Sequence, residues 1–189
     1  MSIVHLVVGG ARSGKSEYAE GCAKALSKKV TYIATAIDTD GSMSDRIKKH
    51  IESRPSTWPT IEQFIHFKSI EQHKDFIGAD VILLDCMTVM MTNLMFAYHQ
   101  DYEAISPEQL DEVESNIIGE FDSLVDSCRK HGKELILVTN EVGLGLVAPY
   151  KLGNYFRDIS GRVNRYVATL ADEVTFVAVG LPLKLKVAE

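Results

Sequence analysis

The sequence predicts an α/β fold with a mostly parallel sheet, helices on both faces of that sheet, and a C-terminal antiparallel hairpin. Short apolar runs rich in β-branched residues alternate with longer stretches of helix-forming residues, which is the pattern of successive β-α-β units. The last segment, 183–187, alternates apolar residues with lysines after a turn expected at 180–182. That alternation is typical of the outer strand of a hairpin at a sheet edge.

The composition favours a single globular domain and argues against several other classes of protein. A length of 189 residues suits one domain, 1–189, and the 46% hydrophobic and 24% charged content is ordinary for a globular protein. A net charge of −6 does not favour a nucleic-acid partner. The three cysteines are odd in number and widely spaced, which argues against a disulfide framework. No membrane-spanning run or signal peptide is evident, so we expect a cytoplasmic protein.

The first loop carries the strongest motif. Residues 9–16 read G-x-x-x-x-G-K-S, the phosphate-binding loop pattern, between an expected strand at 3–8 and an expected helix at 17–26. This context predicts a P-loop NTPase-like domain in which backbone N–H groups and the start of the helix hold an anion. Lys15 would reach the β- and γ-phosphates, and the Ser16 hydroxyl would hold Mg²⁺. The expected nucleotide contacts of the loop are Gly9, Gly10, Ala11, Arg12, Ser13, Gly14, Lys15 and Ser16.

The remaining elements follow in alternation. Further strands are expected at residues 30–35, 60–67, 81–85, 134–139, 173–179 and 183–187. Further helices are expected from Ser42 or Ser44 to 54, and at residues 70–77, 88–99, 106–131 and 154–171.

Local signals justify the boundaries and the burial of these elements. Pro55 ends the helix that precedes it, because proline cannot continue the helical hydrogen bonds. Ser106-Pro107-Glu108 combines a cap, a first-turn proline and an acidic first turn, and Gly132 ends the long helix. The run 81–85 is apolar up to its terminal carboxylate, as a strand buried on both faces is. The segment 88–99 is apolar nearly all round and predicts a buried helix.

Ligands of parallel sheets bind beyond the carboxyl ends of the strands. That rule places Thr35, Asp85 and Asn140–Glu141 on one rim with the phosphate loop. Asp85 either holds Mg²⁺, directly or through water, or caps the helix that follows. Glu141 either positions a hydroxyl or water for attack on phosphorus, or is a solvated loop residue.

Two helix faces carry basic residues. Arg46, His50 and Arg54 are four residues apart and share one face, which suits a polyphosphate or a histidine nucleophile but also suits a basic solvated surface. On the late helix, Arg157, Asp158 and Arg162 surround Gly161. The glycine permits either close packing or approach of a ligand, and the alternative is a surface of salt bridges.

These motifs, in this order, resemble one family over almost the whole chain: the bifunctional adenosylcobinamide kinase / adenosylcobinamide-phosphate guanylyltransferases of cobalamin biosynthesis. The most specific part is His50-x-x-x-Arg54-Pro55-x-x-Trp58-x-Thr60-x-Glu62. The other matching segments are the phosphate loop, Tyr32–Thr35, Arg46-Ile47, Asp85-Cys86 with Thr88, Asn93-Leu94, Thr139–Gly143 with Gly145, and Phe156–Asp158 with Gly161, Arg162 and Asn164. Lys49 stands where some relatives have a second histidine.

The resemblance implies two reactions. ATP or GTP gives its γ-phosphoryl group to the aminopropanol hydroxyl of adenosylcobinamide. GTP then guanylylates a histidine, and GMP passes to adenosylcobinamide phosphate. By position in the motif, His50 is the carrier. The resemblance further implies ring-like trimers, and nucleotide contacts from Ala34, Thr35, Arg46, Ile51, Glu52, Ser53, Arg54, Glu62 and Asp85.

Two other functions remain possible at the level of sequence. A plain small-molecule kinase would use the phosphate loop and leave His50 inert. A nucleotide-dependent switch would perform no synthesis, but the chain has no guanine-specifying N-K-x-D motif.

Overall fold

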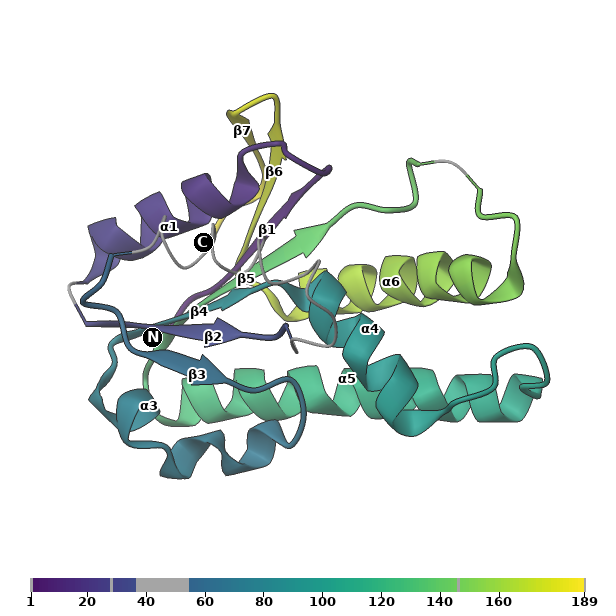
Figure 1. Cartoon of the computed structure of the whole chain (residues 1–189). Helices are drawn as coiled ribbons and strands as arrows, with labels where there is room; N and C mark the ends of the chain where they lie inside the picture. The colour runs from purple at the N-terminus through teal and green to yellow at the C-terminus, as the bar shows by residue number, and fades with distance from the viewer. Residues whose placement is uncertain (1, 28, 37–54, 146, 189) are drawn as a thin grey trace.

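The computed structural model describes residues 2–27, 29–36, 55–145 and 147–188, so the helix expected at 42–54 lies outside the described residues. Figure 1 shows the described chain as one large sheet with helices packed on it. The elements in chain order are β1 (Val4–Gly9), α1 (Lys15–Leu26), β2 (Val30–Ala34), β3 (Thr60–Glu62), the 3-10 helix η1 (Phe67–Gln72), α3 (Lys74–Gly78), β4 (Val81–Asp85), α4 (Met87–Tyr98), α5 (Pro107–Lys130), β5 (Glu134–Asn140), α6 (Lys151–Leu170), β6 (Glu173–Ala178) and β7 (Leu181–Lys186).

The sheet has seven strands in the order β3-β2-β4-β5-β1-β6-β7. All pairings among β1 to β6 are parallel, and β7 runs antiparallel to β6. The predicted fold class is therefore confirmed, including the antiparallel pair at the C-terminal end. β1 lies between β5 and β6, so the loop that follows β1 emerges in the middle of the sheet.

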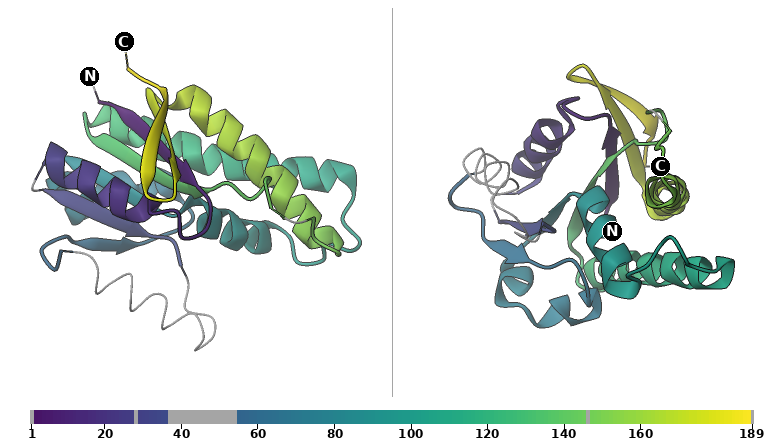
Figure 2. Two further views of the ribbon diagram at one scale, coloured as in Figure 1. Left: turned by 90° about the horizontal axis from the view of Figure 1, so that it is seen from above. Right: turned by 45° about the vertical axis from the view of Figure 1, so that its right-hand side comes forward.

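Helices pack on both faces of the sheet, as the two views of Figure 2 show. Residues of α1 share one buried cluster with inward side chains of β1, β2, β4 and β5 and with Trp58. The larger cluster on the other face joins α4, α5 and α6 to the alternate residues of the same strands. Because side chains of successive strand residues point to opposite faces, a strand covered on both sides must be apolar at every position. Val81, Ile82, Leu83 and Leu84 are all at most 1% exposed, as this requires.

One predicted strand is much shorter than expected. β3 ends at Glu62, although the alternation of apolar residues continues to Phe67. The Glu120 carboxylate of α5 accepts hydrogen bonds from the backbone N–H groups of His66, at 3.0 Å, and Phe67, at 2.8 Å. This long-range contact turns the chain into η1. No local pattern in the sequence encodes it. The expected helix at 70–77 is divided between η1 and α3 at His73, which caps α3 by accepting a hydrogen bond from the Asp75 N–H.

The boundaries of the hairpin and of α6 also differ from the prediction. The hairpin turn is Val179-Gly180, with φ angles of 48° and 81°, and Leu181 and Pro182 already belong to β7. Positive φ at both central residues matches the twist of a two-residue hairpin. α6 begins at Lys151, three residues before the predicted start. The predicted start of α5 is confirmed, because Ser106 forms a capping box with Gln109.

Candidate nucleotide-binding site

The phosphate loop connects the end of β1 to the start of α1. A Cβ at Gly9 would lie 2.4 Å from Ser13 Oγ and 2.6 Å from the Val177 carbonyl oxygen, so only glycine fits there. Gly14, the N-cap of α1, has a φ of 89°, a conformation that glycine adopts without strain. Ser13 Oγ is buried and has no hydrogen-bond partner among the described residues. A buried hydroxyl without a partner calls for one from a ligand or water.

Lys15 is held at the mouth of this loop. It is only 8% exposed, and its Nζ donates a hydrogen bond of 3.2 Å to the Gly10 carbonyl oxygen. Burial, with a smaller contribution from Asp85, raises the pKa of the Cys86 thiol to about 11, while the charge of Lys15 acts in the opposite direction. Asp85 ends β4 and the phosphate loop follows β1, and both strands pair in parallel with β5, so Lys15 and Asp85 lie at the same carboxyl edge of the sheet.

The residues expected on the rim are neighbours in the sheet. Ala34 pairs with Asp85 on one side and with Glu62 on the other. Figure 1 shows the phosphate loop, the start of α4 and the loop after β5 at this same carboxyl edge. The Glu141 N–H donates a 3.0 Å hydrogen bond to the Gly9 carbonyl oxygen, which ties the end of β5 to the start of the phosphate loop.

Thr35 is buried behind this rim. It is 1% exposed, and its hydroxyl donates to the Cys86 carbonyl oxygen at 2.9 Å. Its own carbonyl oxygen accepts a hydrogen bond of 2.7 Å from Asn93 Nδ2. These contacts fix the turn after β2 against α4.

Asp85 is half-buried at the end of β4. The N-cap of α4 is Cys86, and Asp85 lies one residue before it. The cap position is therefore occupied by Cys86, and among the described residues no hydrogen bond joins the Asp85 carboxylate to the first turn of α4. A hydroxyl and a carboxylate, from Ser16 and Asp85, form a donor set that fits Mg²⁺, which uses few protein ligands when phosphates and water complete its shell.

A buried polar network that sequence reasoning did not assign supports the rim. The Thr139 hydroxyl donates to Asn164 Oδ1 at 2.8 Å, and Asn164 Nδ2 donates to the Asn140 carbonyl oxygen at 3.2 Å. The Thr88 hydroxyl accepts from the Asn140 N–H at 2.8 Å. Three elements, α4, β5 and α6, are thereby fixed to one another beside the site. Thr88, Thr139 and Asn164 belong to the matching motifs, but only the fold shows how they meet.

Other candidates have structural partners. Glu141 Oε1 accepts from the Gly143 N–H at 2.7 Å, so this carboxylate shapes its own loop. Arg162 is paired with Glu114 at 2.6 Å, and Arg157 with Asp158 at 3.5 Å, in agreement with a surface of salt bridges. Gly161 is exposed, and a Cβ there would meet nothing within 4 Å, so close packing does not explain this glycine.

Part of the predicted site lies outside the described residues. This part comprises Arg46, His50, Ile51, Glu52, Ser53 and Arg54. The described chain resumes at Pro55 and enters the core at Trp58, whose N–H donates to the Pro55 carbonyl oxygen at 3.0 Å.

The family model for cobinamide kinase / cobinamide phosphate guanyltransferase matches residues 5–185. The chain belongs to this family. It is 42% identical over 183 residues to "Bifunctional adenosylcobalamin biosynthesis protein CobU" of Escherichia coli K12, covering 96% of this chain and 98% of that protein. The Salmonella typhimurium protein of the same name gives the same identity and coverage. The Pseudomonas aeruginosa protein CobP is 35% identical over 181 residues, covering 96% of each chain.

A solved structure also resembles this fold. The flagellar accessory protein FlaH of Methanocaldococcus jannaschii superposes with a TM-score of 0.51, covering 98% of this chain and 79% of that one, at 17% identity. This likeness concerns the fold alone, which is P-loop NTPase-like. None of the helices in the described part of the chain is long and apolar enough to cross a bilayer.

Proposed function

We propose that a single triphosphate site on the domain 1–189 serves both activities of this family member, cobinamide kinase and cobinamide-phosphate guanylyltransferase. The observation that carries the proposal is the position of Lys15, a nearly buried side chain whose Nζ is bonded to the phosphate loop at the Gly10 carbonyl oxygen. Both reactions consume a nucleoside triphosphate. One preformed cradle of N–H groups with one lysine suits each of them.

In the kinase step, the loop amides and Lys15 hold the β- and γ-phosphates of ATP or GTP. Bound Mg²⁺, held by Ser16 and Asp85, would neutralise charge on the phosphate oxygens. The aminopropanol hydroxyl of adenosylcobinamide attacks the γ-phosphorus, the bond to the β-phosphate oxygen breaks and leaves the nucleoside diphosphate, and the hydroxyl proton passes to water. Positioning and electrostatic stabilisation account for most of the catalysis in such transfers.

In the guanylyl step, we propose that a nitrogen of His50 attacks the α-phosphorus of GTP and releases pyrophosphate. The phosphate oxygen of adenosylcobinamide phosphate then attacks the same phosphorus and frees the histidine, giving adenosylcobinamide-GDP. A neutral imidazole is a good nucleophile near pH 7, and a covalent intermediate divides one displacement into two. The role of His50 rests on the family resemblance.

Position-specific labels test the two reactions. Label in the γ-phosphate of ATP should move to the corrinoid without binding covalently to the protein. Label in the α-phosphate of GTP should first appear on the protein and then on the corrinoid phosphate. Covalent α-label that never forms would indicate a plain kinase, and slow GTP hydrolysis with no transfer would indicate a nucleotide switch.

The magnesium site gives a direct test of Asp85. Asp85→Asn should lower turnover roughly 10²-fold in both assays and shift the Mg²⁺ dependence to higher concentration, because an amide is a weaker ligand than a carboxylate. The thermal midpoint should change little, since Asp85 makes no cap for α4. Asp80→Asn, at the opposite end of β4, is the matched control. Unchanged Mg²⁺ dependence would remove Asp85 from the metal site.

We also propose that the protein forms homotrimers in the cytoplasm. The edge strand β7 supports self-association, because its residues Leu181, Leu183 and Leu185 are between 60% and 70% exposed. Sedimentation equilibrium should give three times the chain mass of 21.0 kDa, and Leu183→Lys should lower that mass. A wild-type mass of one chain would contradict the trimer.

The three cysteines are free thiols, which suits a reducing compartment. Cell fractionation checks whether the protein is found in the cytoplasm.

A further inference from the structure

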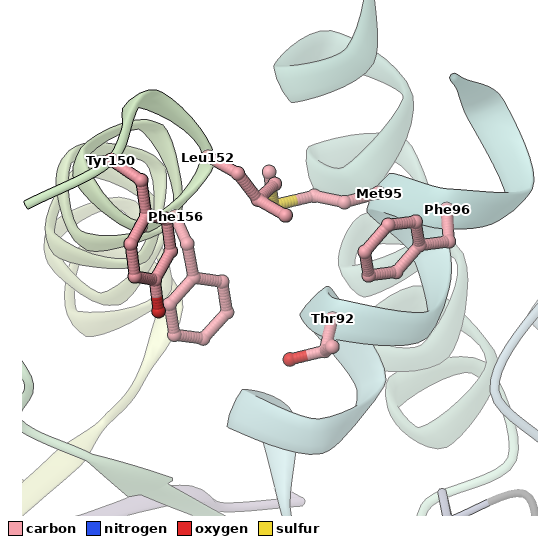
Figure 3. Close-up of a pocket in the computed structure, with 7 residues that line it drawn as sticks. Thr92, Met95, Phe96, Tyr150, Leu152 and Phe156 are labelled. Atoms are coloured by element: carbon pink, nitrogen blue, oxygen red, sulfur yellow. The ribbon is translucent and has the colours of Figure 1, made fainter. Parts of the chain in front are cut away.

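An apolar pocket of about 190 Å³ lies between the second half of α4 and the start of α6. Its lining consists of Thr92, Met95, Phe96, Tyr150, Leu152, Gly153 and Phe156. Figure 3 shows Thr92, Met95 and Phe96 on the α4 side, facing Tyr150, Leu152 and Phe156. None of the lining residues carries a charge. Phe96 is 43% exposed and Tyr150 58% exposed, so the pocket presents aromatic surface to solvent.

Specific contacts hold the α6 wall of this pocket. Asn154 Nδ2 donates hydrogen bonds to the carbonyl oxygens of Ala148, at 3.0 Å, and Tyr150, at 3.1 Å. A Cβ at Gly153 would lie 2.4 Å from the Ala148 Cβ and 2.8 Å from a ring carbon of Tyr150. The absence of a side chain at Gly153 therefore lets the segment before α6 fold back onto the helix and places the Tyr150 ring.

The α4 wall is also fixed. The Tyr102 hydroxyl donates to the Met95 carbonyl oxygen at 2.7 Å, and the Tyr102 ring meets the Phe96 ring edge-on with centroids 6.2 Å apart. Both walls are thus set without a ligand, as is usual for binding pockets.

The pocket is connected to the nucleotide site along α4. Thr88, in the first turn of this helix, is bonded to the end of β5 at the rim. Thr92 lies one turn further, where its hydroxyl donates to the Thr88 carbonyl oxygen at 3.0 Å. Met95 and Phe96 follow in the next turn. At 1.5 Å rise per residue, the lining of α4 lies roughly 6 to 12 Å along the helix axis from Thr88.

From this arrangement we infer that the pocket binds one edge of the corrin ring of cobinamide, with the aminopropanol arm extending along α4 to the phosphate loop. The inference rests on the proposed function. A neutral apolar lining does not suit a triphosphate, but it suits a macrocycle that carries methyl groups and uncharged amides. The Thr92 hydroxyl oxygen, whose proton goes to the Thr88 carbonyl, can still accept a hydrogen bond from an amide N–H, and the Tyr150 hydroxyl can donate or accept one. The volume is smaller than usual for a whole drug-sized ligand, so it holds an edge and not the entire ring.

The length of the substrate agrees with this placement. The arm has seven bonds from the ring carbon to the hydroxyl oxygen and spans roughly 8 Å when extended, at ordinary bond lengths. With the hydroxyl at the γ-phosphate beside Asp85 and Thr88, the ring comes to lie near Thr92 and Phe96.

Cobinamide binding measured separately from GTP use tests the inference. The dissociation constant of cyanocobinamide, which is coloured, is measured by equilibrium dialysis for the wild type, Phe96→Ala and Tyr150→Ala. Each variant should bind cobinamide about tenfold more weakly, the effect of removing an apolar contact from a ligand. The KM for GTP and the yield of GMP bound to the protein, both measured without corrinoid, should not change. Ile77→Ala, at a position 63% exposed on α3, is the control for loss of exposed apolar surface.

Two results would contradict the assignment of this pocket to the corrin ring. Unchanged cobinamide binding in both variants would overturn the inference, and so would weaker GTP use, which would show that the pocket takes the guanine base. Phe96 and Tyr150 are both partly exposed, so the alanine variants are expected to fold. Tyr150→Phe distinguishes the contribution of the Tyr150 hydroxyl to cobinamide binding from that of its ring. The two proposals can fail separately. If the wild type formed no GMP adduct while Phe96→Ala still weakened cobinamide binding, the proposed guanylyl mechanism would be wrong and the assignment of the pocket would be supported.

Discussion

Lys15→Ala should abolish both phosphoryl transfer to cobinamide and formation of the guanylylated protein. One ammonium at one phosphate loop neutralises charge on the transferred group in the first reaction and on the leaving pyrophosphate in the second. Loss of a positioned group of this kind costs roughly 10³-fold or more in turnover. The sequence offers a single match to the loop pattern, so we expect no other site to replace it.

The measurement is initial rates of both assays together with the thermal midpoint of the variant. Lys24→Ala is the matched control, since it lies on the same helix with a side chain 50% exposed and away from the loop. Both activities should survive in the control. If Lys15→Ala lost the kinase step and was still guanylylated at the wild-type rate, a second triphosphate site would exist and the shared-site proposal would be wrong.

The signals from which the sequence predicts the centre of the candidate site are local. The glycines, Lys15 and Ser16 lie within one loop between a clear strand and a clear helix. The parallel sheet then follows from strand–helix alternation, and the carboxyl-edge rule brings Asp85 beside the loop. In the structure Asp85 pairs in register with Ala34.

What the sequence did not predict depends on contacts between distant residues. Glu120 ends β3 from more than fifty positions away, and no periodicity signals this. The network of Thr88, Thr139 and Asn164 joins three elements, and each residue alone reads as an ordinary polar side chain. The pocket lining is equally hidden, because Met95 and Phe96 look like core residues of an apolar helix until the fold leaves Phe96 exposed.

The carrier histidine is a different case. The spacing of Arg46, His50 and Arg54 is compatible with two interpretations, a solvated surface and a phosphate site. Only the family resemblance favours a nucleophile, and these residues lie outside the described ones.

GTP with Mg²⁺ should add one GMP to the protein through a phosphorus–nitrogen bond to His50. That bond should be labile in acid and stable in base, as expected when an imidazole nitrogen and not a hydroxyl is the nucleophile. His50→Asn should abolish both the adduct and guanylyl transfer, because an amide keeps polarity at the position but cannot attack phosphorus. Kinase activity should persist in part, since γ-phosphoryl transfer needs no protein nucleophile.

Intact mass before and after GTP, followed by peptide mapping, locates the adduct. His66→Asn is the matched control: His66 is exposed and has a φ of 63°, which asparagine tolerates, so the adduct should form normally there. If Arg46 and Arg54 hold phosphates from the same face, their alanine variants should weaken both steps. GMP found on Lys49 or on another histidine would rule out His50 as the carrier. If the wild-type protein gained no mass after incubation with GTP and Mg²⁺, no covalent guanylyl intermediate would form, and the protein would be a plain kinase.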